Sequence, residues 1–189
     1  MSNEIIAALK SGNETYKAGL ANPADISAEL RRGLAENGQR PDAVIITCSD
    51  SRVPPEHIFS RGLGELFVIR TAGNVVGDFE RGTAEYAVMH LGVRLIVVMG
   101  HTRCGAVDAA MADAEHGGAH PAALGALVEE VRRGVCDCGG DTRNALRANV
   151  ENSVVRVLES AVLRAEHESG GLMVARAMYD MDTGSVEFW

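Results

Sequence analysis

Residues 43–52 read AVIITCSDSR, and they join a short apolar run to a cluster of polar, chemically reactive side chains. The run from Ala43 to Thr47 is mostly β-branched, which is typical of a strand buried on both faces of a parallel sheet. Two further apolar runs have the same character, ELFVIR at residues 65–70 and RLIVVM at residues 94–99. These three runs predict the central strands of the fold.

Helical patterns separate the predicted strands. Apolar residues recur three and four positions apart in residues 80–91, and residues 106–114 again have a helical pattern. Strands that alternate with helices indicate an α/β fold with a mostly parallel sheet. Near the C-terminus, Asp182-Thr183-Gly184 marks a hairpin turn between residues 172–179 and 185–188. We therefore expect about four parallel strands, an antiparallel C-terminal edge strand and flanking helices.

Helices are also predicted at both ends of the chain. An amphipathic helix is expected over residues 3–20, with a break at Gly12, and a second helix over residues 28–35. Together these would form an N-terminal helical arm over residues 1–37. Residues 142–167 are predicted to form one long helix before the C-terminal hairpin.

The chain has 189 residues with 18 Lys and Arg against 26 Asp and Glu, a formal net charge of −8, and is 46% hydrophobic. It has no internal repeat and no long linker, so a single domain over residues 1–189 is expected. The acidic balance and the lack of long basic runs argue against a nucleic acid or a membrane as partner. The N-terminus, MSNEII, has an acid where a signal peptide has basic residues, so a cytoplasmic location is expected.

Two predicted strands end in residue types that bind metals. Cys48 follows the first strand, and His101 and Cys104 follow the third, so the three side chains would meet if these strands are neighbours. Two thiolates and one imidazole are a common zinc set, and three protein ligands leave a fourth position open, as in catalytic sites. The alternative is that both cysteines are inert core thiols and that His101 is a turn residue.

Asp50 and Arg52 lie beside this predicted metal site. A carboxylate and a guanidinium two residues apart can form a charge-assisted pair. With two thiolates, the zinc and its ligands carry no net charge, so the ion acidifies a bound water less than it would with three imidazoles. An ionised Asp50, held by Arg52, could therefore accept the proton of zinc-bound hydroxide and orient it. Without Arg52, the carboxylate could turn onto the zinc and close the open position.

Four motifs together resemble those of the β-class carbonic anhydrases. They are CSDSRVPPE at residues 48–56, GELFVIRTAGN at residues 64–74, EYAV at residues 85–88 and GHTRCGAV at residues 100–107. The resemblance implies that Cys48, His101 and Cys104 bind one Zn²⁺ ion per subunit. It also implies that Asp50 and Arg52 form the catalytic dyad.

The reaction implied by this resemblance is the reversible hydration of CO₂ to bicarbonate and a proton, by attack of zinc-bound hydroxide that the dyad orients. The implied substrate pocket has hydrogen-bond donors at Gln39 and at the backbone of Ala72 and Gly73. Phe67 and Tyr86 would line it, although a place in the ordinary core is the alternative for both. In this class the pocket forms between two subunits and the N-terminal arm embraces the partner, so a homodimer or a tetramer is expected.

Two features depart from the family pattern. Some bacterial members hold a non-catalytic bicarbonate on a Trp, an Arg and a Tyr, which stabilises an inactive form with the aspartate on zinc. Arg70 and Tyr179 match two of these positions, but the third is Ile45, which has no indole N–H, so we expect this bicarbonate switch to be absent or weak. Cys136-Asp137-Cys138 lies outside the motifs and is either a second soft-metal or redox site or a pair of free surface thiols.

Two other functions remain open from the sequence alone. Relatives with the same zinc set hydrolyse carbonyl sulfide or carbon disulfide, and access to the pocket separates these substrates from CO₂. A non-catalytic module that binds zinc or bicarbonate is the second alternative, and the intact Asp50 and Arg52 pair argues against it.

Overall fold

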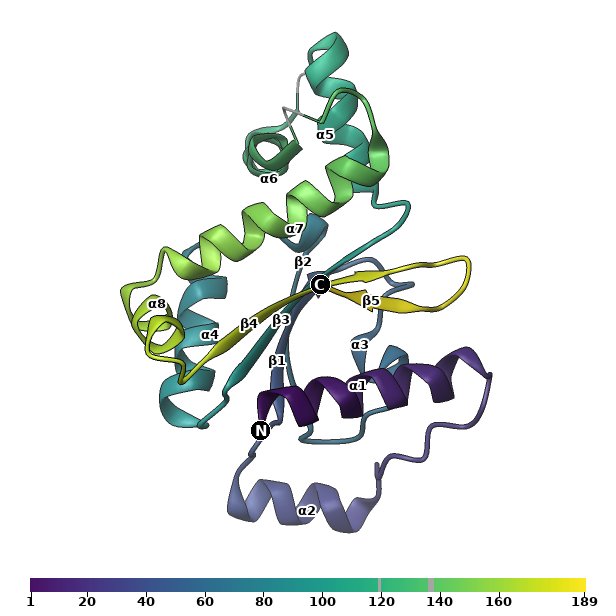
Figure 1. The fold of residues 1–189 in the computed structure, drawn as a ribbon, viewed down its shortest axis with the longest axis vertical. Helices are drawn as coiled ribbons and strands as arrows, with labels where there is room; N and C mark the ends of the chain where they lie inside the picture. Colours follow the sequence, from purple (N-terminus) through teal and green to yellow (C-terminus); the bar gives the residue numbers. More distant parts are fainter. Residues whose placement is uncertain (119, 136–137) are drawn as a thin grey trace.

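The computed structural model describes residues 1–118, 120–135 and 138–189 and contains one five-stranded sheet with helices packed around it (Figure 1). The strands are β1 Ala43–Cys48, β2 Leu66–Thr71, β3 Leu95–His101, β4 Met173–Tyr179 and β5 Val186–Phe188. Their order in the sheet is β2-β1-β3-β4-β5. The first four strands are parallel, and β5 pairs antiparallel with β4. The predicted fold class is therefore confirmed.

β1 and β3 are neighbours at the centre of the sheet. Residues 44–47 of β1 lie opposite residues 96–99 of β3, and every residue of both strands is buried. Because successive side chains point to opposite faces, Ile46 packs in the core cluster on one face and Ile45 in the cluster on the other. The parallel register brings the carboxyl ends of β1 and β3 to the same edge of the sheet.

The helices form two layers and an extension beyond that edge. They are α1 Ser2–Lys17, α2 Ala28–Asn37, α3 Pro55–Ile58, α4 Asp78–His90, α5 Gly105–His116, α6 Ala122–Val135, α7 Thr142–Leu158 and α8 Ala161–Glu168, with a 3-10 turn η1 at Ala72–Asn74. α4, α7 and α8 cover one face of the sheet, and α1 and α3 cover the other (Figure 1). α5, α6 and the first half of α7 enclose a third apolar cluster, which contains Cys48 and Cys104.

α1 is continuous through Gly12, so the predicted break at this glycine is wrong. A Cβ atom at Gly12 would lie 1.8 Å from the carbonyl oxygen of Phe59, just after α3. The carbonyl oxygen of Gly12 accepts a hydrogen bond from Ser60 Oγ at 2.9 Å, and Leu9 and Asn13 are buried nearby on α1. Glycine therefore allows close packing here instead of ending the helix, and α1 packs against its own chain.

Gly12→Ala is expected to lower the free energy of unfolding by about 2–3 kcal/mol, because the added methyl group would overlap backbone atoms of Phe59. Gly33→Ala is the matched control, since Gly33 also lies inside a helix and no atom beyond its chain neighbours and its own helix backbone lies within 4 Å of the position of its Cβ. That change should stabilise the protein by up to about 1 kcal/mol through helix propensity. Urea unfolding measures both values, and an unaltered stability of Gly12→Ala would contradict the tight contact.

The long helix predicted over residues 142–167 is two helices, so this expectation is also wrong. α7 ends at Leu158, and α8 begins after Ser160, whose hydroxyl accepts a hydrogen bond from the amide of Leu163 at 3.2 Å. Serine is a favourable N-cap because its oxygen satisfies an amide at the start of a helix. The same hydroxyl donates to Glu85 at 2.5 Å, which ties the turn to α4.

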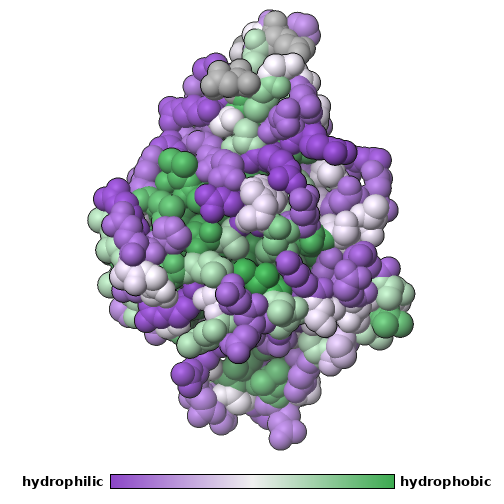
Figure 2. Space-filling model, in the orientation of Figure 1, coloured by the Kyte–Doolittle hydropathy of each residue, from purple (hydrophilic) through white to green (hydrophobic). Residues whose placement is uncertain are grey.

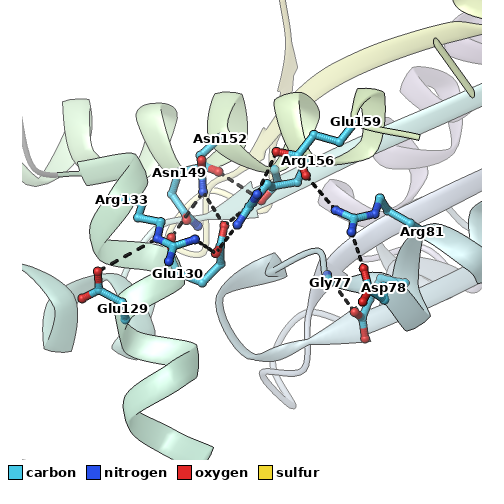
Figure 3. Close-up of polar contacts among 12 residues, drawn as sticks. Gly77, Asp78, Arg81, Glu129, Glu130, Arg133, Asn149, Asn152, Arg156 and Glu159 are labelled. Carbon is cyan, nitrogen blue, oxygen red and sulfur yellow. Dashed lines mark hydrogen bonds and ion pairs between the residues drawn. The ribbon is translucent and has the colours of Figure 1, made fainter. Parts of the chain in front are cut away.

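A chain of ion pairs joins α4, α6 and α7 (Figure 3). Glu130 on α6 accepts two hydrogen bonds of 2.6 Å from Arg156 on α7. Arg156 also donates to Glu159 at 2.7 Å, and Glu159 accepts from Arg81 on α4 at 2.8 Å. Arg81 pairs in turn with Asp78 at the start of α4. Exposed pairs contribute little to stability, so the mostly buried Glu130 and Arg156 pair is the one that we expect to fix α6 against α7.

Apolar patches interrupt the polar surface, one of them toward the bottom of the view, where α2 lies (Figure 2). Large apolar side chains are exposed at Leu20 and Ile26, before α2, and at Phe79, Tyr86 and Met89 on α4. α2 itself has no buried residue. Large exposed apolar patches are common where proteins contact other molecules. In the described ranges, no helix is both long enough and apolar enough to cross a bilayer.

Candidate metal centre

Three potential metal ligands meet at the carboxyl edge of the sheet. Cys48 is the last residue of β1, His101 is the last residue of β3, and Cys104 is the N-cap residue of α5. Their ligand atoms lie within 4.8 Å of one another, and each residue is at most 5% exposed. The predicted convergence required β1 and β3 to be neighbours. They are, and the structure brings the three residues together.

The backbone orients the ring of His101. Nδ1 lies 2.9 Å from the carbonyl oxygen of Thr102, so we assign the ring proton to Nδ1. Nε2 is then an acceptor, and it is buried without a hydrogen-bond partner among the described residues. Buried polar atoms normally have a partner. An open lone pair beside two cysteine sulfurs is a donor set that fits Zn²⁺ or a similar divalent ion.

Backbone amides and a neighbouring thiol stabilise a thiolate at Cys48. Its Sγ accepts hydrogen bonds from the amides of Gly73 at 3.2 Å and Asp50 at 3.4 Å. The thiol of Cys104 also donates to Cys48, which lowers the pKa of Cys48 and raises the pKa of Cys104. In the metal-free protein the two thiols therefore share one proton, which a bound cation would replace.

Asp50 and Arg52 form the pair that their spacing predicted. Arg52 Nε and Nη2 donate to the two carboxylate oxygens of Asp50 at 2.9 and 2.7 Å, and the Arg52 amide donates to the same carboxylate at 2.9 Å. These bonds hold the pKa of Asp50 well below its usual range, so the carboxylate is ionised at neutral pH. Arg52 Nη2 also reaches the carbonyl oxygen of Arg103 at 3.3 Å, which links the loops after β1 and β3.

The turn η1 packs against the candidate metal ligands and requires glycine at position 73. Gly73 has a φ of +66°, and a Cβ there would lie 3.0 Å from both Ala106 Cβ and Val131 Cγ2. Its carbonyl oxygen accepts a hydrogen bond from Asn149 Nδ2 at 2.8 Å. The amide of Gly73, predicted to serve the substrate, is the one that donates to Cys48 Sγ. In this structure it therefore supports the thiolate.

Three buried polar residues that sequence reasoning missed hold η1 in place. Asn74 lies in η1, and Asn149 and Ser153 lie one turn apart on α7; each is at most 3% exposed. Asn74 Nδ2 donates to Ser153 Oγ at 3.0 Å, and Ser153 Oγ donates to the carbonyl oxygen of Asn74 at 2.9 Å. The signal in the sequence is a polar pair at positions i and i+4 among the apolar residues of α7, which does not by itself indicate the loop that the pair binds.

The loop after β3 is tied to the β4–β5 hairpin. Arg103, between the two ligands of this loop, has a φ of +58°, a left-handed conformation that is uncommon outside glycine. Its guanidinium pairs with Asp182 in the hairpin at 2.6 Å. The amide of Met181 donates to Thr102 Oγ1 at 3.0 Å. The hairpin therefore supports the turn that presents two of the three ligands.

The predicted substrate residues Gln39, Phe67 and Tyr86 do not reach this metal centre within one chain. Phe67 lies opposite Val44, four residues before Cys48, which places it about 13 Å from the carboxyl edge of the sheet. The ring of Tyr86 is 6.3 Å from that of Phe67 and is 47% exposed as a residue. Gln39 precedes β1 and lines a separate cavity of about 350 Å³ beside α2.

The stretch Cys136-Asp137-Cys138, predicted as a second site or as free thiols, falls largely outside the described residues. Of the three, the structure describes Cys138, which is partly buried against the cluster that contains Cys48 and Cys104.

Sequence comparisons match most of the chain to one family. A family model described as "Carbonic anhydrase" matches residues 43–186. "Carbonic anhydrase 2" of Mycobacterium tuberculosis is 40% identical over 182 residues, which cover 94% of this chain and 87% of that protein. A carbonic anhydrase of Mycolicibacterium smegmatis is 43% identical over 132 residues, which cover 69% of this chain and 64% of that protein.

Solved structures give the same result. The β-carbonic anhydrase CcaA is 26% identical with a TM-score of 0.74, and the match covers 99% of this chain and 94% of that one. One of two tetrameric β-carbonic anhydrases from Sordaria macrospora is 25% identical with a TM-score of 0.72, covering 98% of this chain and 96% of that one. Sequence and fold therefore agree over nearly the whole length. The chain belongs to the β-carbonic anhydrase family.

Proposed function

We propose that the protein catalyses the reversible hydration of CO₂ to bicarbonate and a proton, with one Zn²⁺ ion per chain held by Cys48, His101 and Cys104. The observation that carries this proposal is the convergence of three buried ligand atoms beside an ionised carboxylate. Relatives that bear the name carbonic anhydrase support it. The ion would supply a Lewis acid that makes water a nucleophile near neutral pH.

Asp50 and Arg52 would orient the reaction. The Asp50 carboxylate can accept a hydrogen bond from the nucleophilic oxygen and direct a lone pair of that oxygen at CO₂. Arg52 holds both carboxylate oxygens, so Asp50 stays off the ligand atoms and the fourth coordination position is left for water or substrate. The two-point contact between Arg52 and Asp50 supports both roles.

We infer that Gln39, Phe67 and Tyr86 line the pocket of a second copy of the chain. A pocket for CO₂ needs an apolar lining with few donors, and within one chain these residues lie away from the metal ligands. The apolar side chains exposed on α4 and before α2 support a contact between copies. We therefore expect a homodimer or a tetramer. Sedimentation velocity measures the assembly, and a stable monomer at micromolar concentration would contradict this inference.

Stopped-flow CO₂ hydration, followed with a pH indicator, tests the proposed function. The protein loaded with one equivalent of Zn²⁺ is expected to accelerate hydration, and the metal-free protein is not. Release of sulfide from carbonyl sulfide or carbon disulfide is assayed in parallel. Sulfide release without CO₂ hydration would favour the hydrolase alternative, and stoichiometric zinc with neither activity would favour a binding module.

Binding of Cd²⁺ to the metal-free protein at pH 7 is expected to release about one proton per ion. Cys48 is already a thiolate at this pH because its pKa is lowered, whereas Cys104 keeps its proton because its pKa is raised. Two independent thiols with pKa values of about 8.5 would release nearly two protons. Cd²⁺ is suited to the measurement because it binds thiolates and its bound water stays protonated at pH 7. Calorimetry in buffers of different ionisation enthalpy counts the protons, and a count near two would contradict the shared proton.

A further inference from the structure

Arg70 contacts residues 48–50, which we call the metal loop because they carry Cys48 and Asp50. Arg70 itself is neither a proposed ligand nor a member of the Asp50 and Arg52 pair. It is in β2, an edge strand of the sheet, directly opposite Thr47. Its Nε donates to the carbonyl oxygen of Cys48 at 3.0 Å, and its Nη2 donates to the carbonyl oxygen of Asp50 at 2.6 Å. The guanidinium is therefore bound to two backbone carbonyls of the segment that follows β1.

This segment carries both a metal ligand and the proposed catalytic carboxylate. The carbonyls of Cys48 and Asp50 flank Ser49, so fixing both of them sets the direction of the backbone through three residues. Two bonds between backbone groups also act here, from the Ser49 amide to the Thr71 carbonyl and from the Val53 amide to the Asp50 carbonyl, both at 3.0 Å. Neither of these two bonds restrains the carbonyl of Cys48, whereas Arg70 restrains both carbonyls at once.

The chemistry of arginine suits this task. Its guanidinium is a planar fork with several N–H donors at fixed angles, whereas lysine has a single ammonium centre. Hydrogen bonds from a charged donor are shorter and stronger than neutral ones.

We propose that Arg70 is a positioning residue for the hydration reaction: it holds the segment from Cys48 to Asp50 so that the Asp50 carboxylate stays on Arg52 and clear of the metal ligands. The catalytic part of this inference rests on the proposed function. Its structural part does not, because the geometry of the metal site can be measured without the reaction. Loss of Arg70 would free the segment and let Cys48 Sγ move relative to the other two ligands.

Arg70→Met and Arg70→Lys test the proposal, with Arg176→Met as the matched control. Methionine keeps a long aliphatic side chain and removes both donors, and lysine keeps the charge but not the fork. Arg176 is also a strand arginine, in β4, and it donates to the carbonyl of Val174 at 3.3 Å and to Glu151 at 2.9 Å. Its loss removes comparable bonds without changing a contact to the metal loop.

Arg70→Met is expected to lower kcat about 10- to 100-fold with a smaller change in KM, as is typical when a residue that orients a metal site is lost. The Co²⁺-substituted variant should have an altered visible spectrum, because the d–d bands depend on coordination number and geometry. Arg70→Lys should be intermediate in both measurements. Arg176→Met should match the wild-type protein in both.

A wild-type kcat together with a wild-type Co²⁺ spectrum in Arg70→Met would overturn the proposal. Equal losses in Arg70→Met and Arg176→Met would also overturn it, because they would trace the effect to general stability, which urea unfolding of each variant measures. If Arg70→Met does not fold, Arg70→Lys decides the question by the same readouts. If the wild-type protein does not hydrate CO₂, the proposed function fails, and the Co²⁺ spectra still decide whether Arg70 positions the loop.

Discussion

Cys104→Ser is expected to lose stoichiometric zinc and to lower kcat/KM for CO₂ hydration by at least about 10³-fold, because a Lewis acid supplies several kcal/mol of transition-state stabilisation. Serine has nearly the size of cysteine, but its neutral hydroxyl is a poor substitute for a soft thiolate ligand. Cys104 is also the N-cap residue of α5, a position that serine occupies well. The fold should therefore survive, and metal analysis with stopped-flow kinetics measures the loss.

Cys138→Ser is the matched control for this substitution. Cys138 packs at the edge of the same apolar cluster but lies outside the group of three ligands. Cys138→Ser is expected to keep one zinc ion per chain and the wild-type rate of CO₂ hydration. A second zinc ion that disappears in Cys138→Ser would instead assign a metal to the stretch from Cys136 to Cys138. Full zinc binding by Cys104→Ser would contradict the ligand set.

The candidate metal centre is the most predictable part of the molecule, because its candidate ligands follow buried strands directly. Cys48 ends β1 and His101 ends β3, and parallel strands bring such ends to one edge. Only the neighbour relation of β1 and β3 had to be assumed. By contrast, the motifs predict that Phe67 and Tyr86 line the substrate pocket, yet within one chain both residues lie away from the three candidate ligands.

Local signals failed where tertiary packing decides. Gly12 reads as a helix breaker, yet α1 continues through it because its missing side chain admits the backbone of Phe59. Ser160 reads as an ordinary helical position, yet it caps α8 and turns the chain. A glycine inside a helical pattern can end the helix or allow close packing, and a serine can lie inside a helix or cap its start. Long-range contacts decide which of the two applies.

The supporting hydrogen bonds were also beyond the reach of sequence reasoning. Arg70 and Asn149 are separated from their partners by 20 or more residues, and each binds a backbone carbonyl. A backbone acceptor has no residue type, so no motif indicates the pairing. Residues of this kind are found only when the fold places the donor beside the loop.

The prediction that the bicarbonate switch is absent or weak rests on Ile45, which has no indole N–H. Ile45 is fully buried in the core of the sheet. The hydroxyl of Tyr179 lies 3.0 Å from that of Tyr16 on α1, and burial together with this hydrogen bond raises the pKa of Tyr179. Arg70 is bound to two backbone carbonyls. All three side chains thus make contacts within the fold, while the Arg70 guanidinium keeps N–H donors that these two bonds do not use.

Asp50→Asn is expected to keep zinc and to lower kcat about 10²- to 10³-fold, the usual range for losing an acid–base or orienting group. The change removes the negative charge that Arg52 binds, and it replaces one of two acceptor oxygens with an NH₂ group that faces an N–H donor. Because the pKa of Asp50 lies well below its usual range, the wild-type carboxylate is ionised throughout. The deficit should therefore be constant from about pH 6 to pH 9.

Glu187→Gln is the matched control for this loss of charge. Glu187 is an exposed carboxylate on β5 that pairs with Arg147 at 2.6 Å, and it lies outside the loops that carry the candidate ligands. It should leave both zinc content and kcat unchanged. Stopped-flow kinetics of the zinc-loaded variants compare the two effects. If Asp50→Asn hydrates CO₂ at the wild-type rate, an ionised carboxylate is not needed to orient the nucleophile, and Arg52 then has only a structural part. If Asp50→Asn also loses zinc, Asp50 helps to hold the ligands in place, which is the role that we propose for Arg70.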